Sequence, residues 1–393
     1  MRPRLASTAT CRAGGLFAAE ICRRSGETRE IVDPELTYRL GSSLQSLLAL
    51  GDHDWTLEEV RYAANSPTTA GLYRVRFGDK SLFVKVLRSY RLWPQLALLP
   101  AEFQTLAVRG DLWRYEADVY IDGLTYSLPT GLRLPELYGV DLLDDDHLVM
   151  VMEDVRTTES AWDRERYGAA AQLLGRLNVR LTRNDTLPAA IDRTPGRFTS
   201  MMVSGFVEQF ALPPLLDPTT WEHPLLAGSN LRHDLEELAS RIPQVLQELA
   251  GRPHLMSHGD ACPQNLLIPT DASDTFVGID WSPGGMVAAG DDLGQLLIGR
   301  AHSGELTVAE LAELRELLID RYHAGLVSEG CSNITTDDVR TGLDSALMLR
   351  SAFASLPLNR MAEPMTEELE QLVGQRLELT RYLVELGTVS LGR

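Results

Sequence analysis

A short segment in the last third of the chain carries the residue types that phosphoryl transfer requires. Residues 257–265 read SHGDACPQN, and the triplet IDW follows at 279–281. The reaction needs a carboxylate that orients an attacking hydroxyl or accepts its proton. It also needs oxygen ligands for the Mg²⁺ that bridges the nucleotide phosphates. We therefore assign Asp260 to the hydroxyl, and Asn265 and Asp280 to the metal. The alternative is an ordinary turn followed by a strand-end cap.

Short apolar runs predict strands around this segment. They lie at 254–257, 266–268 and 275–280. The last two form a predicted hairpin that returns Asp280 to the edge of the site where Asn265 lies. Gly259 permits tight backbone geometry beside Asp260. His258 is interpreted as a packed, hydrogen-bonded residue that supports the loop rather than as a proton carrier.

The first part of the chain is predicted to be rich in strands. Gly78-Asp79 is a tight-turn signal between two apolar runs. The expected strands are 72–77, 82–86 and 147–152, and the expected helices are 34–50 and 94–121. Beyond Glu153, apolar residues recur at helical spacing. The helices expected there are 170–181, 231–242, 308–325, 337–355 and 365–387, with Pro243 kinking or restarting the second.

This change of pattern predicts two lobes with a small-molecule cleft between them. The N-lobe spans residues 31–153 and covers the nucleotide. The C-lobe spans residues 154–393 and contains the catalytic loop, the metal site and the helices that bind the acceptor. Residues 1–30 are predicted to form a mobile N-terminal extension.

Composition limits the classes of partner. The chain has 393 residues, with 37 Lys or Arg and 55 Asp or Glu, so its formal net charge is −18. Nucleic acids and anionic membranes bind basic surfaces, so neither is an expected partner. The four cysteines lack a CxxC spacing, which indicates free thiols in a reducing compartment and predicts a cytoplasmic protein. Composition leaves the oligomeric state open.

The motifs together resemble those of the aminoglycoside phosphotransferase and choline kinase-like family of small-molecule kinases. They are H-G-D-x4-N, I-D-W and then Gly290-Asp291-Asp292-Leu293. The resemblance covers residues 55–355. It implies an α+β, bilobal protein-kinase-like fold, ATP or GTP as phosphate donor, Mg²⁺ as cofactor and a small-molecule acceptor. Asp292 matches the family's D-L position, which buttresses the catalytic loop.

The family also has a lysine on its third strand that pairs with the nucleotide phosphates. Lys85 fits this position, because it is a lone cation in the apolar run LFVKV, where an unpaired charge is costly. The lysine needs a carboxylate on the following helix. Glu116 matches the family's helix, and Glu102 on the same predicted helical stretch is the alternative.

Two further nucleotide contacts follow from position in the family pattern. The run VMVMEDV at 149–155 resembles the segment that joins the lobes, which assigns Glu153 and Val155 to nucleotide binding. The turn that covers the nucleotide corresponds to 65–71 and has one glycine, where the family is usually glycine-rich.

Hydroxyl groups in this turn remain potential phosphate donors beside the backbone amides. They belong to Ser66, Thr68 and Thr69. A second departure is Asn178, where the family often has histidine. The helix that carries Asn178 is interpreted as largely structural.

The sequence thus predicts an ATP- or GTP-dependent kinase that acts on a small-molecule hydroxyl, such as that of an aminoglycoside-like antibiotic, an amine alcohol or a sugar. One alternative is an inactive nucleotide-binding module of the same fold, against which the presence of Lys85, Asp260, Asn265 and Asp280 argues. The other is a protein kinase, against which H-G-D, I-D-W and the absence of A-P-E argue. Acidic residues of the C-lobe are compatible with a cationic acceptor, but solvated helix faces have the same composition.

Overall fold

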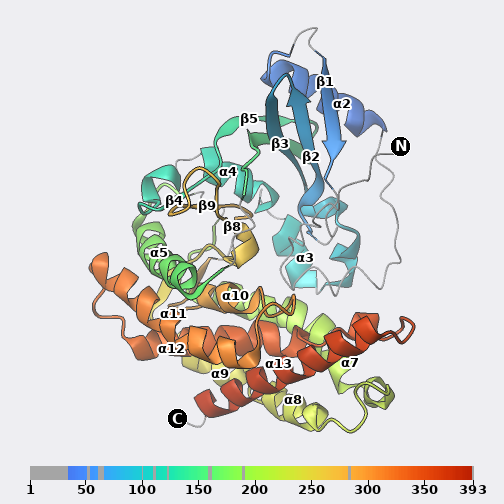
Figure 1. Ribbon diagram of the computed structural model, residues 1–393, viewed down its shortest axis with the longest axis vertical. Helices are drawn as coiled ribbons and strands as arrows, with labels where there is room; N and C mark the ends of the chain where they lie inside the picture. The colour runs from blue at the N-terminus through green and yellow to red at the C-terminus, as the bar shows by residue number, and fades with distance from the viewer. Residues whose placement is uncertain are drawn as a thin grey trace, which may run out of the picture.

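A strand-rich N-lobe lies above a larger, mostly helical C-lobe (Figure 1). The computed structural model describes residues 34–50, 54–60, 66–99, 101–108, 112–121, 124–157, 162–187, 191–281 and 285–391. The expected extension at 1–30 lies outside them. The arrangement confirms the predicted α+β bilobal fold. Within the described residues, no helix has both the length and the apolar character needed to cross a membrane.

The N-lobe is built on a five-stranded antiparallel sheet of order β1-β2-β3-β6-β5. Its strands are β1 (Trp55–Glu59), β2 (Thr69–Phe77), β3 (Lys80–Arg88), β5 (Leu137–Leu142) and β6 (His147–Glu153). The predicted turn at Gly78-Asp79 joins β2 to β3. The edge strands β1 and β5 were not predicted, because their mostly half-exposed residues show no clear apolar alternation.

Both faces of this sheet are covered. On one face, α2 (Pro34–Leu47) packs Leu40 and Leu44 against buried valines of the strands. On the other face, Leu87 joins the core that continues into the C-lobe. Because side chains alternate along a strand, Lys85 shares the face of Leu87. Its ammonium group is therefore directed toward the C-lobe.

The continuous helix predicted at 94–121 is wrong. The segment contains a 3₁₀ turn at Pro94–Leu98, then α3 (Ala101–Val108), a second 3₁₀ turn, and α4 (Tyr115–Ile121). The sequence has prolines at 94 and 100, and proline lacks the N–H group that would continue a helix.

The C-lobe is a stack of helices interrupted by short strand pairs (Figure 1). Its helices are α5 (Arg164–Arg183), α6 (Arg197–Met202), α7 (Leu212–Leu216), α8 (Leu231–Ser240), α9 (Ile242–Ala250), α10 (Asp292–Ile298), α11 (Val308–Ser328), α12 (Thr336–Ala346) and α13 (Glu367–Leu391). Pro243 lies in the first turn of α9, as expected for a restarted helix.

Two helical segments have π-type hydrogen bonding, η6 (Val203–Ala211) and η9 (Leu347–Ser351). The helix predicted at 337–355 is therefore α-helical only to Ala346. Periodicity alone did not distinguish these wider turns from α-helix, because both bury similar apolar residues.

Short strands place the catalytic segment between the lobes. They are β4 (Leu132–Arg133), β7 (His254–Met256), β8 (Leu266–Leu267), β9 (Phe276–Gly278) and β10 (Met286–Ala288). β7, β8 and β9 match the predicted strands, whereas β4 and β10 were not predicted. In the β8–β9 hairpin Leu266 lies opposite Gly278, and the Ile279 N–H donates to the Asn265 carbonyl at 3.0 Å. The hairpin thus brings the two ends of the motif together.

Candidate active site

A cluster of three charged side chains, buried Lys85 and Glu116 with half-buried Asp280, connects the two lobes. Lys85 on β3 forms an ion pair with Glu116 on α4, with 2.6 Å between Nζ and Oε2. Its ammonium group also pairs with the Asp280 carboxylate, which follows β9. The structure therefore pairs Lys85 with Glu116, while the side chain of Glu102 lies outside the described part. Three elements far apart in the sequence meet at this ammonium group.

The charge state of Lys85 follows from its neighbours. Burial alone would lower the pKa of Lys85, but the Asp280 and Glu116 carboxylates outweigh burial and raise this pKa above its ordinary value. Lys85 therefore carries a positive charge at neutral pH. A fixed charge held by carboxylates is the state needed to bind the phosphates of a nucleotide.

Asp280 is held in an unusual backbone conformation. Its φ is +54°, in the left-handed region that few non-glycine residues occupy. Aspartate tolerates this region better than most residues, but the conformation still requires support from the surrounding structure. The adjacent β9 pairing and the bond to Lys85 supply that support.

Asp260 and Asn265 face each other across the catalytic loop. Asn265 Nδ2 donates to the Asp260 carbonyl at 2.9 Å and to Asp260 Oδ2 at 3.2 Å. The Oδ1 atoms of both residues are buried without a hydrogen-bond partner among the described residues. Each of these oxygens can still accept a bond. A carboxylate oxygen suits a hydroxyl proton, and an amide oxygen suits a hard cation.

Asp260 is a weaker acid than an ordinary aspartate. Burial raises the pKa of Asp260 to about 6, against the opposing charge of Arg350, and the charge of Asp280 adds to the increase. A carboxylate with this pKa is ionised at neutral pH and basic enough to accept a proton from a hydroxyl whose pKa falls during reaction.

Hydrogen bonds to the backbone hold the catalytic loop. Asp292, at the start of α10, accepts from the N–H groups of His258 at 2.9 Å and Gly259 at 3.1 Å. Asn178 on α5 donates to the same carboxylate at 2.9 Å. Gly259 has φ of +87°, which explains the need for glycine beside Asp260.

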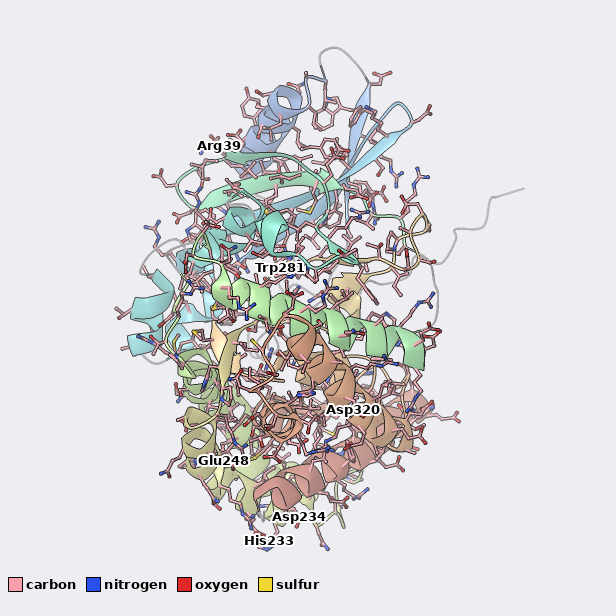
Figure 2. All side chains as sticks on the ribbon, turned by 90° about the vertical axis from the view of Figure 1, so that its left-hand side faces the viewer. Arg39, His233, Asp234, Glu248, Trp281 and Asp320 are labelled. Atoms are coloured by element: carbon pink, nitrogen blue, oxygen red, sulfur yellow. The ribbon has the colours of Figure 1, made fainter. Side chains whose placement is uncertain are left out.

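His258 is a packed residue of the loop. It is fully buried, and its ring lies 4.3 Å from that of Trp281, centroid to centroid. Figure 2 places Trp281 between the N-lobe sheet and the C-lobe helices. Burial lowers the pKa of His258, and its Nδ1 accepts from the Asp260 N–H at 3.3 Å. A neutral, buried imidazole bonded to backbone supports the loop and has no route to exchange protons with a substrate.

The segment that joins the lobes is anchored through Glu153. The Glu153 carboxylate accepts two bonds from Arg133, at 2.6 and 2.9 Å, and its N–H donates to the Glu136 carbonyl at 2.8 Å. The carboxylate and the N–H of Glu153 are thus engaged within the protein, and its predicted nucleotide contact stays a prediction. Val155 lies two residues beyond β6 and is half-exposed.

One expectation for the nucleotide-covering turn needs correction. The Thr69 hydroxyl is buried and donates to Ser66 Oγ at 3.0 Å, and the Thr69 N–H donates to the same atom at 3.2 Å. Its single hydroxyl proton therefore stabilises the turn instead of reaching phosphate. The phosphate contacts of Ser66 and half-exposed Thr68 stay predictions. Arg88, which the sequence analysis missed, donates to the carbonyls of Pro67 and Ser66 at 3.2 and 3.3 Å.

Arg350 near the loop was also missed, and the contacts of Asn178 and Asp291 were not predicted. Arg350 donates to the Gly259 carbonyl, Asn178 supports Asp292, and Asp291 is buried beside Asp292. Asn178 is a single buried amide in the apolar stripe of α5, where an unpaired polar group is costly, and Asp292 supplies its partner. Nothing local marks Arg350, because its partner is 91 residues away.

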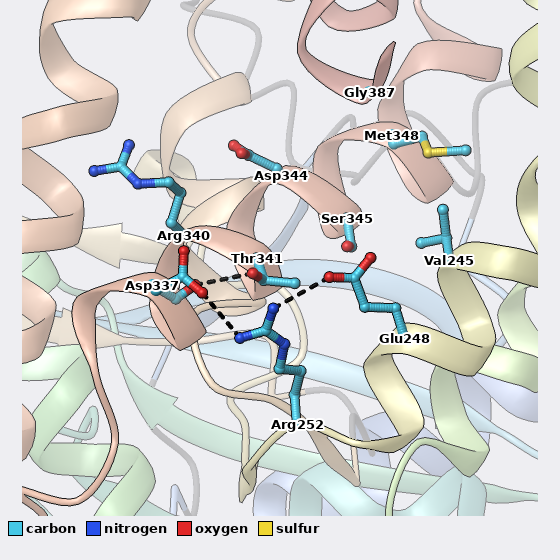
Figure 3. A pocket seen from close by; sticks show the side chains of 10 residues that line it. All are labelled: Val245, Glu248, Arg252, Asp337, Arg340, Thr341, Asp344, Ser345, Met348 and Gly387. Carbon is cyan, nitrogen blue, oxygen red and sulfur yellow. Dashed lines mark hydrogen bonds and ion pairs between the residues drawn. The ribbon is translucent and has the colours of Figure 1, made fainter. Parts of the chain in front are cut away.

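A separate cavity of about 310 Å³ lies between α9, α12, η9 and α13. Figure 3 shows that Arg252 pairs inside it with Glu248 at 3.2 Å and Asp337 at 3.0 Å. The second arginine that lines the cavity, Arg340, forms an ion pair with Glu316. The cavity's arginines are thus already neutralised by carboxylates, and none of the residues assigned to phosphoryl transfer lines it.

Solved structures of small-molecule kinases share the fold. Choline kinase from Cryptosporidium parvum superposes with a TM-score of 0.51 and 13% identity, over 91% of this chain and 94% of that chain. A point mutant of aminoglycoside 2'-phosphotransferase IIIa in complex with GDP gives 0.50 and 14%, over 91% and 99%. An aminoglycoside phosphotransferase from Alicyclobacillus acidocaldarius gives 0.50 and 13%, over 82% and 91%. These similarities establish the fold.

Sequence comparison adds no closer relative. No protein-family model matches the chain, and no curated protein matches it.

Proposed function

We propose that this chain is a small-molecule kinase that transfers the terminal phosphate of ATP or GTP to a hydroxyl group. The observation that carries the proposal is the convergence of Lys85, Glu116 and Asp280 beside the Asp260–Asn265 pair. The Ile279 N–H donates to the Asn265 carbonyl at 3.0 Å, so Asp280, the next residue, lies beside this pair. A phosphate-binding cation, an open carboxylate and an open amide oxygen are the parts that this reaction needs.

In the proposed reaction, Asp260 orients the acceptor hydroxyl and accepts its proton. A bond forms between the acceptor oxygen and the terminal phosphorus, and the bond from that phosphorus to the nucleotide oxygen breaks. Lys85, held by Glu116, binds the nucleotide phosphates. The protein contributes mainly position and charge, because the transition state needs little covalent help.

The donor set of the site fits Mg²⁺. This ion takes one or two protein oxygens and fills its other positions with phosphate and water. Asn265, through its open Oδ1, and Asp280 would hold it. When bound, Mg²⁺ supplies positive charge that neutralises the phosphates.

The acceptor is proposed only as a class. The similar structures include a choline kinase and aminoglycoside phosphotransferases, so amine alcohols, aminoglycosides and sugars are the first compounds to test. The chain's net charge of −18 favours a cationic acceptor over an anionic one, because an acidic surface concentrates cations.

A coupled assay of nucleotide consumption tests the proposal directly. ATP and GTP are each supplied with Mg²⁺ and a panel of aminoglycosides, macrolides, amine alcohols and sugars, using wild type and Asp260→Asn. We expect nucleotide consumption that depends on one class of acceptor in wild type and is lost in Asp260→Asn, with phosphorylated acceptor detected by mass spectrometry.

Calorimetric titration of Mg-nucleotide separates the alternatives. Nucleotide binding without transfer to any acceptor would favour the inactive module. Phosphorylation of a protein substrate, with no small molecule accepted, would favour a protein kinase. Absence of both nucleotide binding and transfer would overturn the proposal.

A further inference from the structure

Gly259 is held at both of its polar backbone atoms. Its N–H donates to Asp292 at 3.1 Å, and its carbonyl accepts from Arg350 Nη1 at 3.2 Å. The two partners come from different helical elements, α10 and η9. Because Asp260 is the next residue, the orientation of the Gly259–Asp260 peptide sets the direction of the Asp260 side chain.

The element that carries Arg350 is braced against the same loop. A Cβ at Gly342 of α12 would collide with the Ala289 carbonyl, and Gly294 of α10 packs on Ala346. Arg350 lies in the π-type segment η9, which continues directly from α12. The continuous α12–η9 segment therefore contacts the Ala289–Gly294 segment and then reaches Gly259.

Arg350 binds the backbone of the catalytic loop rather than a carboxylate of the site. Arg350 donates to a backbone carbonyl, while its charge acts at longer range on Asp260 and on buried Asp291. The remaining charged or titratable groups that act on Asp260 are Asp280 after β9 and Asp292 on α10, with Cys262 beside it on the loop.

We propose that Arg350 is a positioning residue for phosphoryl transfer, which acts by clamping the Gly259 carbonyl and so directing Asp260 at the acceptor hydroxyl. This inference rests on the proposed function. Asp292 clamps the N–H side of Gly259, and Arg350 clamps the carbonyl side. Without Arg350 the Gly259–Asp260 peptide keeps only the 3.3 Å bond from the Asp260 N–H to His258 Nδ1 and gains freedom to rotate, so the geometry needed for reaction is populated less often.

Kinetics with an acceptor found by the screen test the role. Arg350→Ala should lower kcat by about tenfold, the loss expected when one hydrogen bond from a charged donor is removed. Nucleotide affinity and acceptor KM should stay unchanged, because Arg350 contacts neither in this scheme. Added millimolar guanidinium should restore part of the kcat of Arg350→Ala, and Arg350→Lys should retain more activity than Arg350→Ala.

Arg183→Ala is the matched control. Arg183 also donates from Nη1 to a backbone carbonyl, that of Glu329, at 2.8 Å, but at an exposed position away from the loop. Its removal should leave kcat unchanged, and guanidinium should have no effect on it. An equal loss of kcat in both variants would show a general cost of losing an arginine and would overturn the proposal.

Hydrogen exchange measures the clamp without any acceptor. In Arg350→Ala, amide exchange in peptides covering 257–262 should accelerate by about tenfold, with peptides of α5 and α11 unchanged. If wild type transfers no phosphate, the proposed function fails while this measurement still decides whether the clamp exists. Unchanged exchange in Arg350→Ala would overturn the clamp itself.

Two other roles for Arg350 give different results. If Arg350 served only to neutralise Asp291, adding Asp291→Asn would restore the kcat of Arg350→Ala. If it bound the acceptor, Arg350→Ala would raise acceptor KM at unchanged kcat and exchange. Either result would overturn the positioning role, whereas an unrestored kcat with unchanged KM would support it.

Discussion

The two halves of the proposed site are held together by different kinds of interaction. In the nucleotide-binding half, Lys85, Glu116 and Asp280 are joined by side-chain ion pairs between the lobes. In the catalytic loop, Asp292 and Arg350 bind backbone groups of His258 and Gly259 within the C-lobe.

This difference indicates what each half does when substrate binds. Ion pairs between side chains can exchange one partner for another, so the Lys85 cluster can admit phosphate and metal without unfolding. Backbone clamps have no substitute partner and keep the loop in one conformation. Substitutions in the first half should therefore change nucleotide binding, whereas those in the second should change transfer or stability.

The largest expected effect separates Asp260 from Asp280. Asp260→Asn should lower transfer by about 10² to 10⁴-fold at unchanged Mg-nucleotide affinity, because a general base is lost. Asp280→Asn should weaken Mg-nucleotide binding itself, because a hard cation loses an anionic ligand. Calorimetry beside a transfer assay measures both. Equal losses of nucleotide affinity in the two variants would contradict this division of roles.

Breaking the ion pair at Lys85 should have the next largest effect. Lys85→Met leaves Glu116 and Asp280 without their shared cation, and removing one partner of a buried pair costs about 3–5 kcal/mol of unfolding free energy. Nucleotide KM should also rise. Glu116→Gln should show a milder form of both defects, since Asp280 still pairs with the lysine.

Urea unfolding and nucleotide titration measure these changes. Lys80→Met is the control, because Lys80 is an exposed lysine on the same strand. Wild-type nucleotide affinity in Lys85→Met would show that the assignment of this strand to phosphate binding is wrong.

Substitution of Asp291 should raise the stability of the folded state, whereas substitution of Lys85 should lower it. Burial raises the pKa of Asp291 from 3.8 to about 7, against the opposing charge of Arg350. Between these pH values the folded state retains a proton that the unfolded state has lost, so stability falls as pH rises from about 4 to about 7. Asp291→Asn should therefore raise the unfolding free energy above about pH 7 by at most about 4 kcal/mol.

The same substitution should have no effect below about pH 4, where both states bind the proton. Urea titrations at several pH values check this, with exposed Asp274→Asn as the control. A stabilisation independent of pH would contradict the argument from burial.

The smallest effect is expected at the nucleotide-covering turn. Ser66→Ala removes the acceptor of two bonds from Thr69, each with a net contribution of about 1 kcal/mol. A looser turn should raise nucleotide KM a few-fold and leave kcat unchanged. Thr68→Ala is the comparison. It removes a hydroxyl from the same turn but keeps the backbone bond from the Arg88 N–H to the Thr68 carbonyl. Equal effects of the two substitutions would favour direct phosphate contacts over support of the turn.

Local sequence determined the centre of the site. Asp260 and Asn265 are five residues apart, and the hairpin before Asp280 is formed by adjacent apolar runs. Strand alternation likewise determined which face Lys85 occupies. These features could be predicted because a short stretch of chain has few ways to bury its apolar residues and pair its backbone.

Only the tertiary structure decided which distant groups complete the site. Asn178 reaches Asp292 across 114 residues, and Arg350 reaches Gly259 across 91. The same holds for Thr69, whose hydroxyl proton goes to Ser66 rather than to phosphate. The partner of a polar group depends on which donors and acceptors packing brings within about 3 Å, and no periodicity in the sequence records that distance.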